Sequence, residues 1–196
     1  MIRKWLTVSN LLSGLFFAVL IVLALNHYSK SLFLRGLMKI GFYQPKIVQP
    51  LEDDHLVTIA PDMIFTDSSG QPIHLTDLKG KVVFLDFWAT WCPYCISELP
   101  AINDLHLKLA ANKDIVFIMA DVDNNLGKSA KFMADHQYSL PVNGIDGSIT
   151  QIMPDGTIPA TLIIDKGGRI VYKHVGSADY SNPKISDYLV QLATDK

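Results

Sequence analysis

The chain has 196 residues, of which 49% are hydrophobic and 18% charged, and its formal net charge at pH 7 is −2. Residues 1–40 hold five Lys and Arg and no acidic residue, so residues 41–196 hold 12 Lys and Arg against all 19 Asp and Glu, a net charge of −7. This acidic balance argues against nucleic-acid binding, and the length beyond residue 55 suffices for one domain with a sizeable core.

An apolar span opens the chain. No Asp, Glu, Lys or Arg occurs from Trp5 to Ser29. A helix of about 20 apolar residues crosses a bilayer, so we expect residues 1–29 to form an N-terminal membrane anchor. The alternative is a cleaved signal peptide, with Val22-Leu23-Ala24 as a weak cleavage site. Cations stand on both sides of the span, so the positive-inside rule leaves its orientation open.

Residues 30–55 connect this span to the main domain. Their first part mixes cations with large apolar residues, as a helix lying at the membrane interface does. It could equally serve as a docking surface for a partner or as a tether. Pro45 and Pro50 then mark a linker that ends near His55. The domain boundary is therefore expected at residue 56, with one domain from 56 to 196.

The pattern of apolar residues in this domain predicts an α/β fold with a mixed sheet. Apolar runs flanked by turn residues predict strands and hairpins, and periodic segments predict helices. Asn182 and Pro183 are typical of a helix start, as N-cap and first helical residue. The expected elements, in chain order, are a hairpin of residues 63–65 and 73–75, a strand at 82–88, a helix at 93–111, a strand at 115–120, a helix at 126–136, a hairpin of 160–164 and 170–172, and a helix from 183.

Two cysteines occur in the chain, and both lie in the segment Trp91-Cys92-Pro93-Tyr94-Cys95. A helix N-terminus carries unpaired N–H groups and a partial positive charge, which stabilise a thiolate. Cys92 is therefore the expected nucleophile, with an accessible sulfur and a lowered pKa, and Cys95 the resolving thiol. Together they are expected to form a redox-active disulfide. Pro93 suits the first turn because it has no N–H to leave unpaired.

Other roles for a cysteine pair fit this sequence less well. A zinc site would lack two ligands, since no His pair of suitable spacing follows. Attachment of a c-type haem requires His directly after the second cysteine, where Ile96 stands. Two buried cysteines without a redox role are the remaining alternative. We therefore expect neither a metal nor a cofactor.

Several segments accompany the cysteine motif: Gly70–Ile73, Leu75–Lys81, Phe87–Cys92, Glu98 with Pro100, and Ile158–Asp165 with the following Lys-Gly-Gly-Arg turn. Together they resemble the TlpA/ResA-type membrane-anchored thiol-disulfide oxidoreductases of bacteria, which have a thioredoxin-like fold. The resemblance covers about residues 59–192. It implies a mixed central sheet with an N-terminal hairpin, preceded by one transmembrane helix.

The resemblance also assigns roles to residues outside the cysteine motif. Pro159 matches the cis-proline that faces the disulfide, and Ile158 before it would pair with an extended substrate. Trp91, Pro93 and Tyr94 are expected to shape the substrate-binding surface, and Pro100 to kink the helix. The Pro93-Tyr94 pair is typical of glutaredoxins, so the direction of electron transfer stays open.

Two carboxyl groups are candidates for proton handling. Asp86 stands in an apolar strand, where burial would raise its pKa, and thioredoxins carry a buried Asp at the matching position. We expect Asp86 to take the proton of Cys95 during resolution, directly or through water. A surface carboxylate at a strand edge is the alternative. Glu98, three residues after Cys95, would either tune that thiol or remain solvated.

The expected activity is reduction of disulfides in extracytoplasmic proteins by the Cys92/Cys95 dithiol, with no cofactor. The resemblance implies a membrane thiol-disulfide transporter as electron donor and an exported disulfide protein, such as apocytochrome c, as client. It places the domain in the periplasm, tethered to the inner membrane. The alternatives are a disulfide-forming oxidase, a peroxidase on the same fold, and a non-catalytic membrane-tethered adaptor.

Overall fold

The computed structural model describes residues 8–25, 29–30, 33–34, 36–37, 58–147, 152 and 155–195. Helix α1 spans Val8–Leu25, and its described side chains, residues 11–21, are all exposed. Within the described ranges, no helix combines the length and apolar character that a bilayer crossing requires. The anchor at residues 1–29 therefore stays a prediction. Most of the predicted interfacial segment and linker, residues 30–55, lies outside the described residues.

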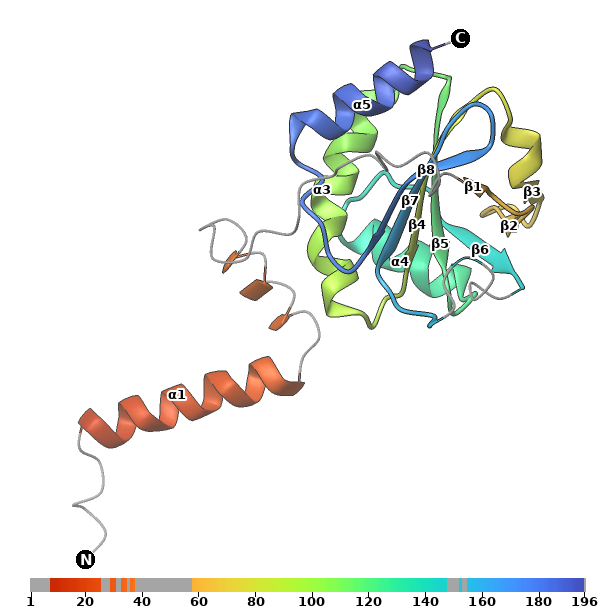
Figure 1. The fold of residues 1–196 in the computed structure, drawn as a ribbon. Coiled ribbons are helices and arrows are strands. Elements are labelled where there is room, and N and C mark those ends of the chain that lie inside the picture. The colour runs from red at the N-terminus through yellow and green to blue at the C-terminus, as the bar shows by residue number, and fades with distance from the viewer. Residues whose placement is uncertain are drawn as a thin grey trace, which may run out of the picture.

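A mixed sheet forms the centre of the domain (Figure 1). Its strand order is β1-β8-β7-β4-β5-β6-β2-β3, with β4 parallel to β5 and antiparallel to β7. Of the described residues, those in strands are β1 Thr58–Ile59, β2 Ile64–Thr66, β3 Pro72–His74, β4 Val82–Trp88, β5 Ile115–Asp121, β6 Asn143–Asp146, β7 Ala160–Ile164 and β8 Arg169–Val175.

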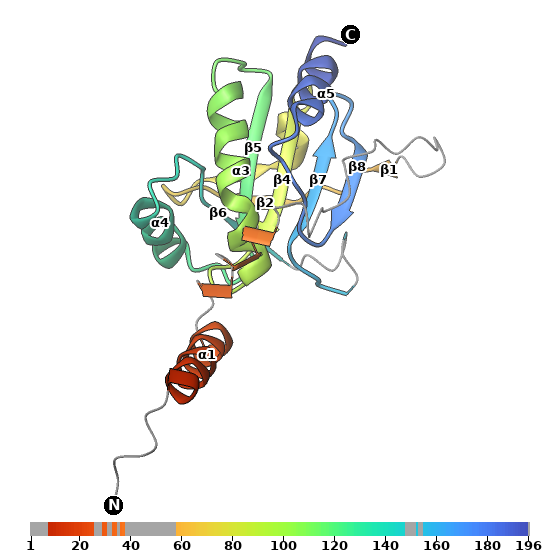
Figure 2. The same cartoon turned by 90° about the vertical axis from the view of Figure 1, so that its left-hand side faces the viewer.

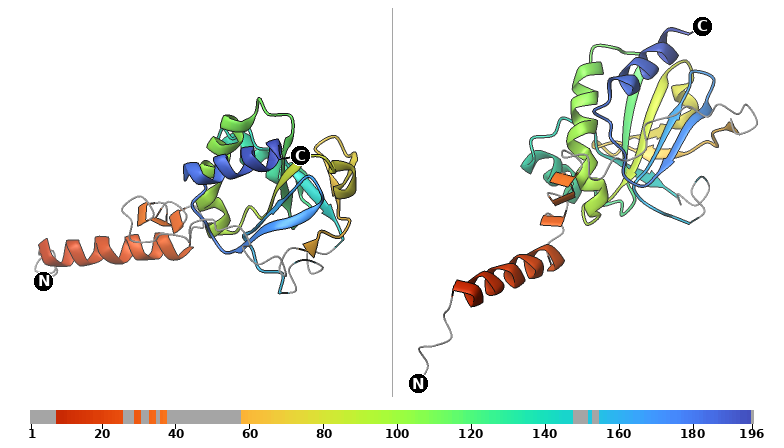
Figure 3. Two further views of the ribbon diagram at one scale, coloured as in Figure 1. Left: turned by 45° about the horizontal axis from the view of Figure 1, so that its top comes forward. Right: turned by 60° about the vertical axis from the view of Figure 1, so that its left-hand side comes forward.

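Three helices cover one face of this sheet: α3 (Pro93–Leu109), α4 (Leu126–Asp135) and α5 (Pro183–Thr194), as Figures 2 and 3 show. The opposite face carries a second apolar cluster, to which the β2–β3 hairpin at one end of the sheet and the 3-10 helix η2, Leu75–Leu78, contribute. Side chains of a strand alternate between faces, and every residue of β4 is buried. Central strands covered on both faces are continuously apolar for this reason, and β4 departs from that rule at one residue, Asp86.

The structure confirms the predicted elements with small changes at their ends. Helix α3 ends two residues before the predicted position, and β8 continues three residues beyond it. Asn182 caps α5 by accepting a hydrogen bond from the N–H of Lys184 over 3.0 Å, with Pro183 at the first helical position. Pro100 lies inside α3, as expected. Strands β1 and β6 were not predicted.

Candidate active site

Cys92 and Cys95 form a disulfide at the start of α3, with their Cα atoms 5.3 Å apart. Cys92 is the N-cap residue of the helix, and Pro93 follows in the first turn. The backbone N–H of Cys95 donates to the Cys92 sulfur over 3.2 Å. When the disulfide opens, this donor and the positive helix end favour a thiolate at Cys92, as the sequence predicts.

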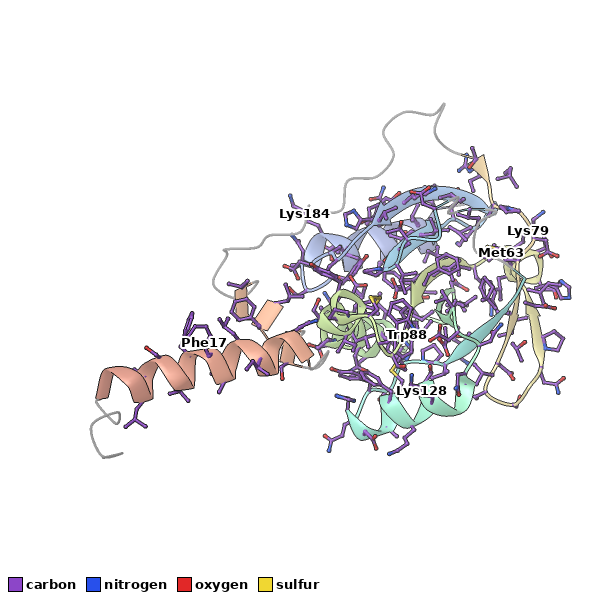
Figure 4. The ribbon with its side chains drawn as sticks, turned by 90° about the horizontal axis from the view of Figure 1, so that it is seen from below. Phe17, Met63, Lys79, Trp88, Lys128 and Lys184 are labelled. Atoms are coloured by element: carbon purple, nitrogen blue, oxygen red, sulfur yellow. A yellow bond between two sulfur atoms is a disulfide. The ribbon has the colours of Figure 1, made fainter. Side chains whose placement is uncertain are left out.

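The two sulfurs differ in access to solvent. Cys95 is fully buried, and 4% of the Cys92 surface is exposed in this disulfide form. The sequence predicts an accessible Cys92 sulfur, whereas the structure has Cys92 almost fully buried in this disulfide form. Trp88 lies in the interior of the domain (Figure 4) and belongs to the apolar cluster that contains both cysteines.

Two aromatic side chains flank the disulfide at the surface. Trp91 is 47% and Tyr94 48% exposed, while Pro93 between them is half-buried. The indole N–H of Trp91 donates to Asp123 Oδ2 over 2.6 Å, so the loop after β5 fixes this ring. Exposed aromatic rings beside a reactive group provide apolar contact area for a partner, and the substrate-binding roles of these residues stay a prediction.

The peptide bond between Ile158 and Pro159 is cis, as predicted. Pro159 directly precedes β7, whose first residue, Ala160, pairs with Phe87 of β4. Because β7 runs antiparallel to β4, the start of β7 and the end of β4 meet at one edge of the sheet. The cis-proline therefore lies at the same edge as the cysteine motif, and the half-buried Ile158 packs against the apolar cluster of both cysteines.

Asp86 is fully buried in the central strand β4, as predicted, so the alternative of a surface carboxylate at a strand edge is wrong. The Thr161 hydroxyl donates to Asp86 Oδ1 over 2.7 Å. Burial raises the pKa of Asp86 to about 7, and the hydrogen bond from Thr161 opposes this rise. Its second oxygen has no hydrogen-bond partner among the described residues. This carboxyl group can thus gain or lose a proton near neutral pH.

Glu98 is 1% exposed on the inner side of α3, so the solvated alternative is wrong for this residue too. It accepts a hydrogen bond from the backbone N–H of Ala178 over 3.1 Å. Burial and, second, the charge of Asp86 raise the pKa of Glu98 well above its usual range. Two carboxyl groups that interact in this way titrate as a pair. Glu98 is one helical turn beyond Cys95, so the pair of carboxyl groups, Glu98 and Asp86, lies near the start of α3.

Four polar partners of the site were not predicted from the sequence. They are Thr161 beside Asp86, Tyr180 behind Thr161, the N–H of Ala178 on Glu98, and Asp123 on Trp91. Only the alternation of β7 hints at one of them, because a threonine among apolar residues points to the face that Asp86 occupies once the register of β4 and β7 is known.

Most of the domain is similar to a known protein family. The model of the Redoxin family matches residues 57–192. The chain belongs to the Redoxin family. Within the described part of this Redoxin-family chain, no group of three or more His, Cys, Asp or Glu side chains is arranged to hold a metal ion.

Relatives of this Redoxin-family chain include thiol-disulfide oxidoreductases named ResA. One such protein of Bacillus cereus is 34% identical over 134 residues, which cover 68% of this chain and 76% of the relative. The protein of Bacillus subtilis is 30% identical over 131 residues, which cover 66% of this chain and 72% of the relative. These relatives confirm the predicted ResA-type assignment and a thiol-disulfide oxidoreductase activity.

Solved structures agree with this assignment. A protein from Bacteroides vulgatus described as a thiol-disulfide oxidoreductase is 31% identical with a TM-score of 0.58, covering 68% of this chain and 93% of its own. A protein from Chlorobium tepidum described as a thiol:disulfide interchange protein DsbE is 30% identical with a TM-score of 0.53. The match covers 68% of this chain and 91% of the Chlorobium tepidum chain. The thioredoxin-like α/β fold with a mixed sheet is thereby confirmed.

Proposed function

We propose that this thiol-disulfide oxidoreductase reduces disulfides of extracytoplasmic proteins from a position on the bacterial inner membrane, with its catalytic domain in the periplasm. The observation that carries the chemistry is the Cys92–Cys95 disulfide at the N-terminus of α3, where the Cys95 N–H donates to the Cys92 sulfur. The direction and the location are supported by the likeness to ResA-type relatives and by the apolar span from Trp5 to Ser29.

The first step is attack of the Cys92 thiolate on a substrate disulfide. A bond forms between Cys92 and one substrate sulfur, the substrate disulfide breaks, and the other substrate sulfur leaves as a thiolate that takes a proton from solvent. Cys92 is then linked to the substrate in a mixed disulfide. The exposed rings of Trp91 and Tyr94 and the backbone of Ile158 are the surfaces that hold the substrate during this step.

The second step is resolution by Cys95. Its thiol gives a proton to the Asp86 carboxylate, and the resulting thiolate attacks the Cys92 sulfur. The Cys92–Cys95 disulfide forms, the mixed disulfide breaks, and the second substrate sulfur leaves as a thiolate. The substrate has gained two electrons and the enzyme has lost two. The burial of Asp86 and its pKa of about 7 support this role, because a general base works best when its pKa is near the working pH.

The oxidised enzyme requires a donor of two electrons. For a periplasmic domain this donor is a membrane thiol-disulfide transporter, which reduces the Cys92–Cys95 disulfide by the same exchange in reverse. An exported protein with a disulfide, such as apocytochrome c, is the client. Residues 30–55 would then separate the domain from the membrane.

Mixed-disulfide trapping tests the client and donor. Cys95→Ser leaves Cys92 able to attack but removes the resolving thiol, so partners should accumulate as complexes that a reductant releases. Cys92→Ser with Cys95→Ser is the matched control and should trap nothing. Recovery of exported disulfide proteins supports the proposal, and recovery of cytoplasmic proteins alone contradicts the location.

The reduction potential tests the direction of transfer. We expect equilibration with glutathione buffers to give a potential well below that of DsbA, about −120 mV, because reductases have more negative potentials. A value near that of DsbA would instead identify an oxidase. Consumption of peroxide by the purified protein would point to the peroxidase alternative, and function retained by the double cysteine variant would point to an adaptor.

Asp86→Asn tests the proposed general base. Asn cannot accept the Cys95 proton, so the rate of resolution at pH 7 should fall and lose its dependence on a group titrating near pH 7. A resolution rate equal to that of the parent protein across the pH range would exclude this role.

A further inference from the structure

The loop that joins β8 to α5, residues 176–182, contacts two parts of the site that come from distant segments. The N–H of Gly176 donates to the carbonyl oxygen of Pro159 over 2.8 Å. The N–H of Ala178 donates to Glu98 Oε2 over 3.1 Å. One short segment therefore holds the cis-proline and one of the two buried carboxyl groups.

The same loop reaches the second carboxyl group through a side chain. The hydroxyl of Tyr180 donates to Thr161 Oγ1, and the Thr161 hydroxyl donates to Asp86 Oδ1 over 2.7 Å. An ionised carboxylate only accepts hydrogen bonds, and a threonine hydroxyl has one hydrogen to donate. The order of donors is therefore set: Tyr180 to Thr161, and Thr161 to Asp86. All three residues are at most 1% exposed.

A chain of this kind favours the ionised form of Asp86. The hydroxyl of Thr161 stabilises the negative charge of Asp86 directly. The hydroxyl of Tyr180 polarises the hydroxyl of Thr161 and so strengthens the hydrogen bond from Thr161 to Asp86. Burial raises the pKa of Tyr180 well above its usual range, so its phenol remains a donor throughout the working pH range. This stabilisation opposes the desolvation of Asp86.

We propose that Thr161 and Tyr180 are positioning residues that set the pH at which Asp86 accepts the proton of Cys95, and that Tyr180 acts only through Thr161. This inference rests on the proposed role of Asp86 as general base. It assigns a function in the exchange reaction to the β8–α5 loop, which is outside the cysteine motif and the cis-proline.

Other titratable groups interact with Asp86 or with its neighbours. Glu98 from α3 and Tyr180 from the loop interact electrostatically with it. Tyr172 from β8 interacts with both of these groups, and His174 stacks on Tyr172 with ring centroids 6.3 Å apart. A substitution at Thr161 replaces none of these four side chains, and among the hydrogen bonds of Thr161 it changes those to Asp86 and from Tyr180.

The direct measurement is the titration of the Asp86 carboxyl group by carbon-13 NMR in the oxidised full-length protein, where neither cysteine titrates. Thr161→Val removes the donor to Asp86, and we expect the midpoint to rise by about one pH unit. Tyr180→Phe should raise it by about half as much. Thr161→Ser keeps the hydroxyl and should restore the parent midpoint. Tyr188→Phe on α5 is the matched control and should leave it unchanged.

The serial order gives a sharper criterion. In the Thr161→Val background, Tyr180→Phe should cause no further rise, because the hydrogen-bond route from Tyr180 to Asp86 is already removed and the neutral phenol carries no charge. Additive rises would overturn the claim that Tyr180 acts through Thr161. A midpoint in Thr161→Val equal to that of the parent would overturn the proposal as a whole. If Tyr180→Phe does not fold, the comparison of Thr161→Val with Thr161→Ser still decides.

The kinetic measurement separates this proposal from the one on which it rests. The pH at half-maximal resolution rate should move in Thr161→Val by the same amount as the NMR midpoint. One outcome is that Asp86→Asn abolishes the pH dependence of resolution while the pH at half-maximal rate is the same in Thr161→Val and in the control Tyr188→Phe. In that case the hydrogen bonds of Thr161 and Tyr180 have no role in resolution, but Asp86 is still the general base. If Asp86→Asn leaves resolution unchanged, the base role fails, and the NMR titration alone then tests the control of Asp86 by the chain.

Discussion

The backbone N–H of Cys95 donates to the sulfur of Cys92 within the first turn of α3, over 3.2 Å. In the reduced protein this donor would face a charged sulfur, and hydrogen bonds to charged groups are the stronger ones. This hydrogen bond therefore stabilises a negative charge on Cys92, the outer cysteine of the pair. The inner cysteine is fully buried, and burial disfavours a negative charge there.

This asymmetry predicts different reactivities for the two thiols. In reduced Cys95→Ser, the pKa of Cys92 should lie between about 3.5 and 7.5, below the value of about 8.5 for a free cysteine. The rate of alkylation by iodoacetamide as a function of pH measures it. Reduced Cys92→Ser is the control, and its Cys95 should react only at much higher pH. A Cys92 that titrates near 8.5 would contradict the account of the helix N-terminus.

A second prediction concerns the cap of α5. The Asn182 side chain accepts a hydrogen bond from the Lys184 N–H, so Asn182→Ala should lower the free energy of unfolding by about 1 kcal/mol. Urea denaturation measures this change. Asn182→Asp retains an acceptor oxygen and should be close to the parent protein. Equal losses in both variants would show that the cap does not contribute.

Local patterns were sufficient to predict most of the fold. The buried run of β4 and the helix start at Pro93 are encoded within a few residues, by continuous apolar residues and by capping chemistry. Strand β6 was missed because Asn143–Asp146 is a short, partly polar segment. Its strand conformation results from pairing with β2 and with β5, which are distant in sequence.

Some residues of the site were likewise predictable from local sequence, and others were not. The cysteine motif was predictable because three residues of spacing at a helix start determine its chemistry. Asp86 was predictable because a carboxyl group inside an apolar strand is conspicuous. The partners of Asp86 were not, because Thr161 is 75 positions away and Tyr180 a further 19, and only the register of β4 and β7 and the path of the loop bring them together.

A third prediction concerns the surface beside the disulfide. Asp123 holds the indole N–H of Trp91, and removing this acceptor should let the ring leave its position. We expect Asp123→Ala to raise KM for a protein disulfide substrate about fivefold, the effect of about one hydrogen bond, with kcat unchanged. Asp123→Asn keeps an oxygen acceptor and should have a smaller effect.

Reduction by a small dithiol provides the control for this third prediction, because dithiothreitol makes no contact with an extended surface. Its rate with Asp123→Ala should equal that with the parent protein. If the small-molecule rate falls as much as the protein-substrate rate, Asp123 affects the disulfide itself and not the contact surface.

The last prediction is the effect of Asp86 on stability. Its pKa is about 7 in the folded protein against 3.8 for the ordinary group. Between these values the folded protein binds a proton that the unfolded chain has lost, so the free energy of unfolding falls as pH rises from 4 to 7. Above pH 7 both states are ionised, and the cost of the buried charge is fully present. Glu98, whose pKa is also raised, contributes with the same sign.

Asp86→Asn removes the buried charge and should therefore stabilise the oxidised protein at pH 8 by roughly 2–4 kcal/mol. At pH 4 the difference from the parent should nearly vanish, because Asp86 is then protonated in the folded state. Urea denaturation at pH 4, 6 and 8 measures both values. Asp135→Asn breaks an exposed pair with Lys131 and is the control, with an expected change below about 1 kcal/mol. A stabilisation by Asp86→Asn that is equal at all three pH values would show that Asp86 does not titrate in this range.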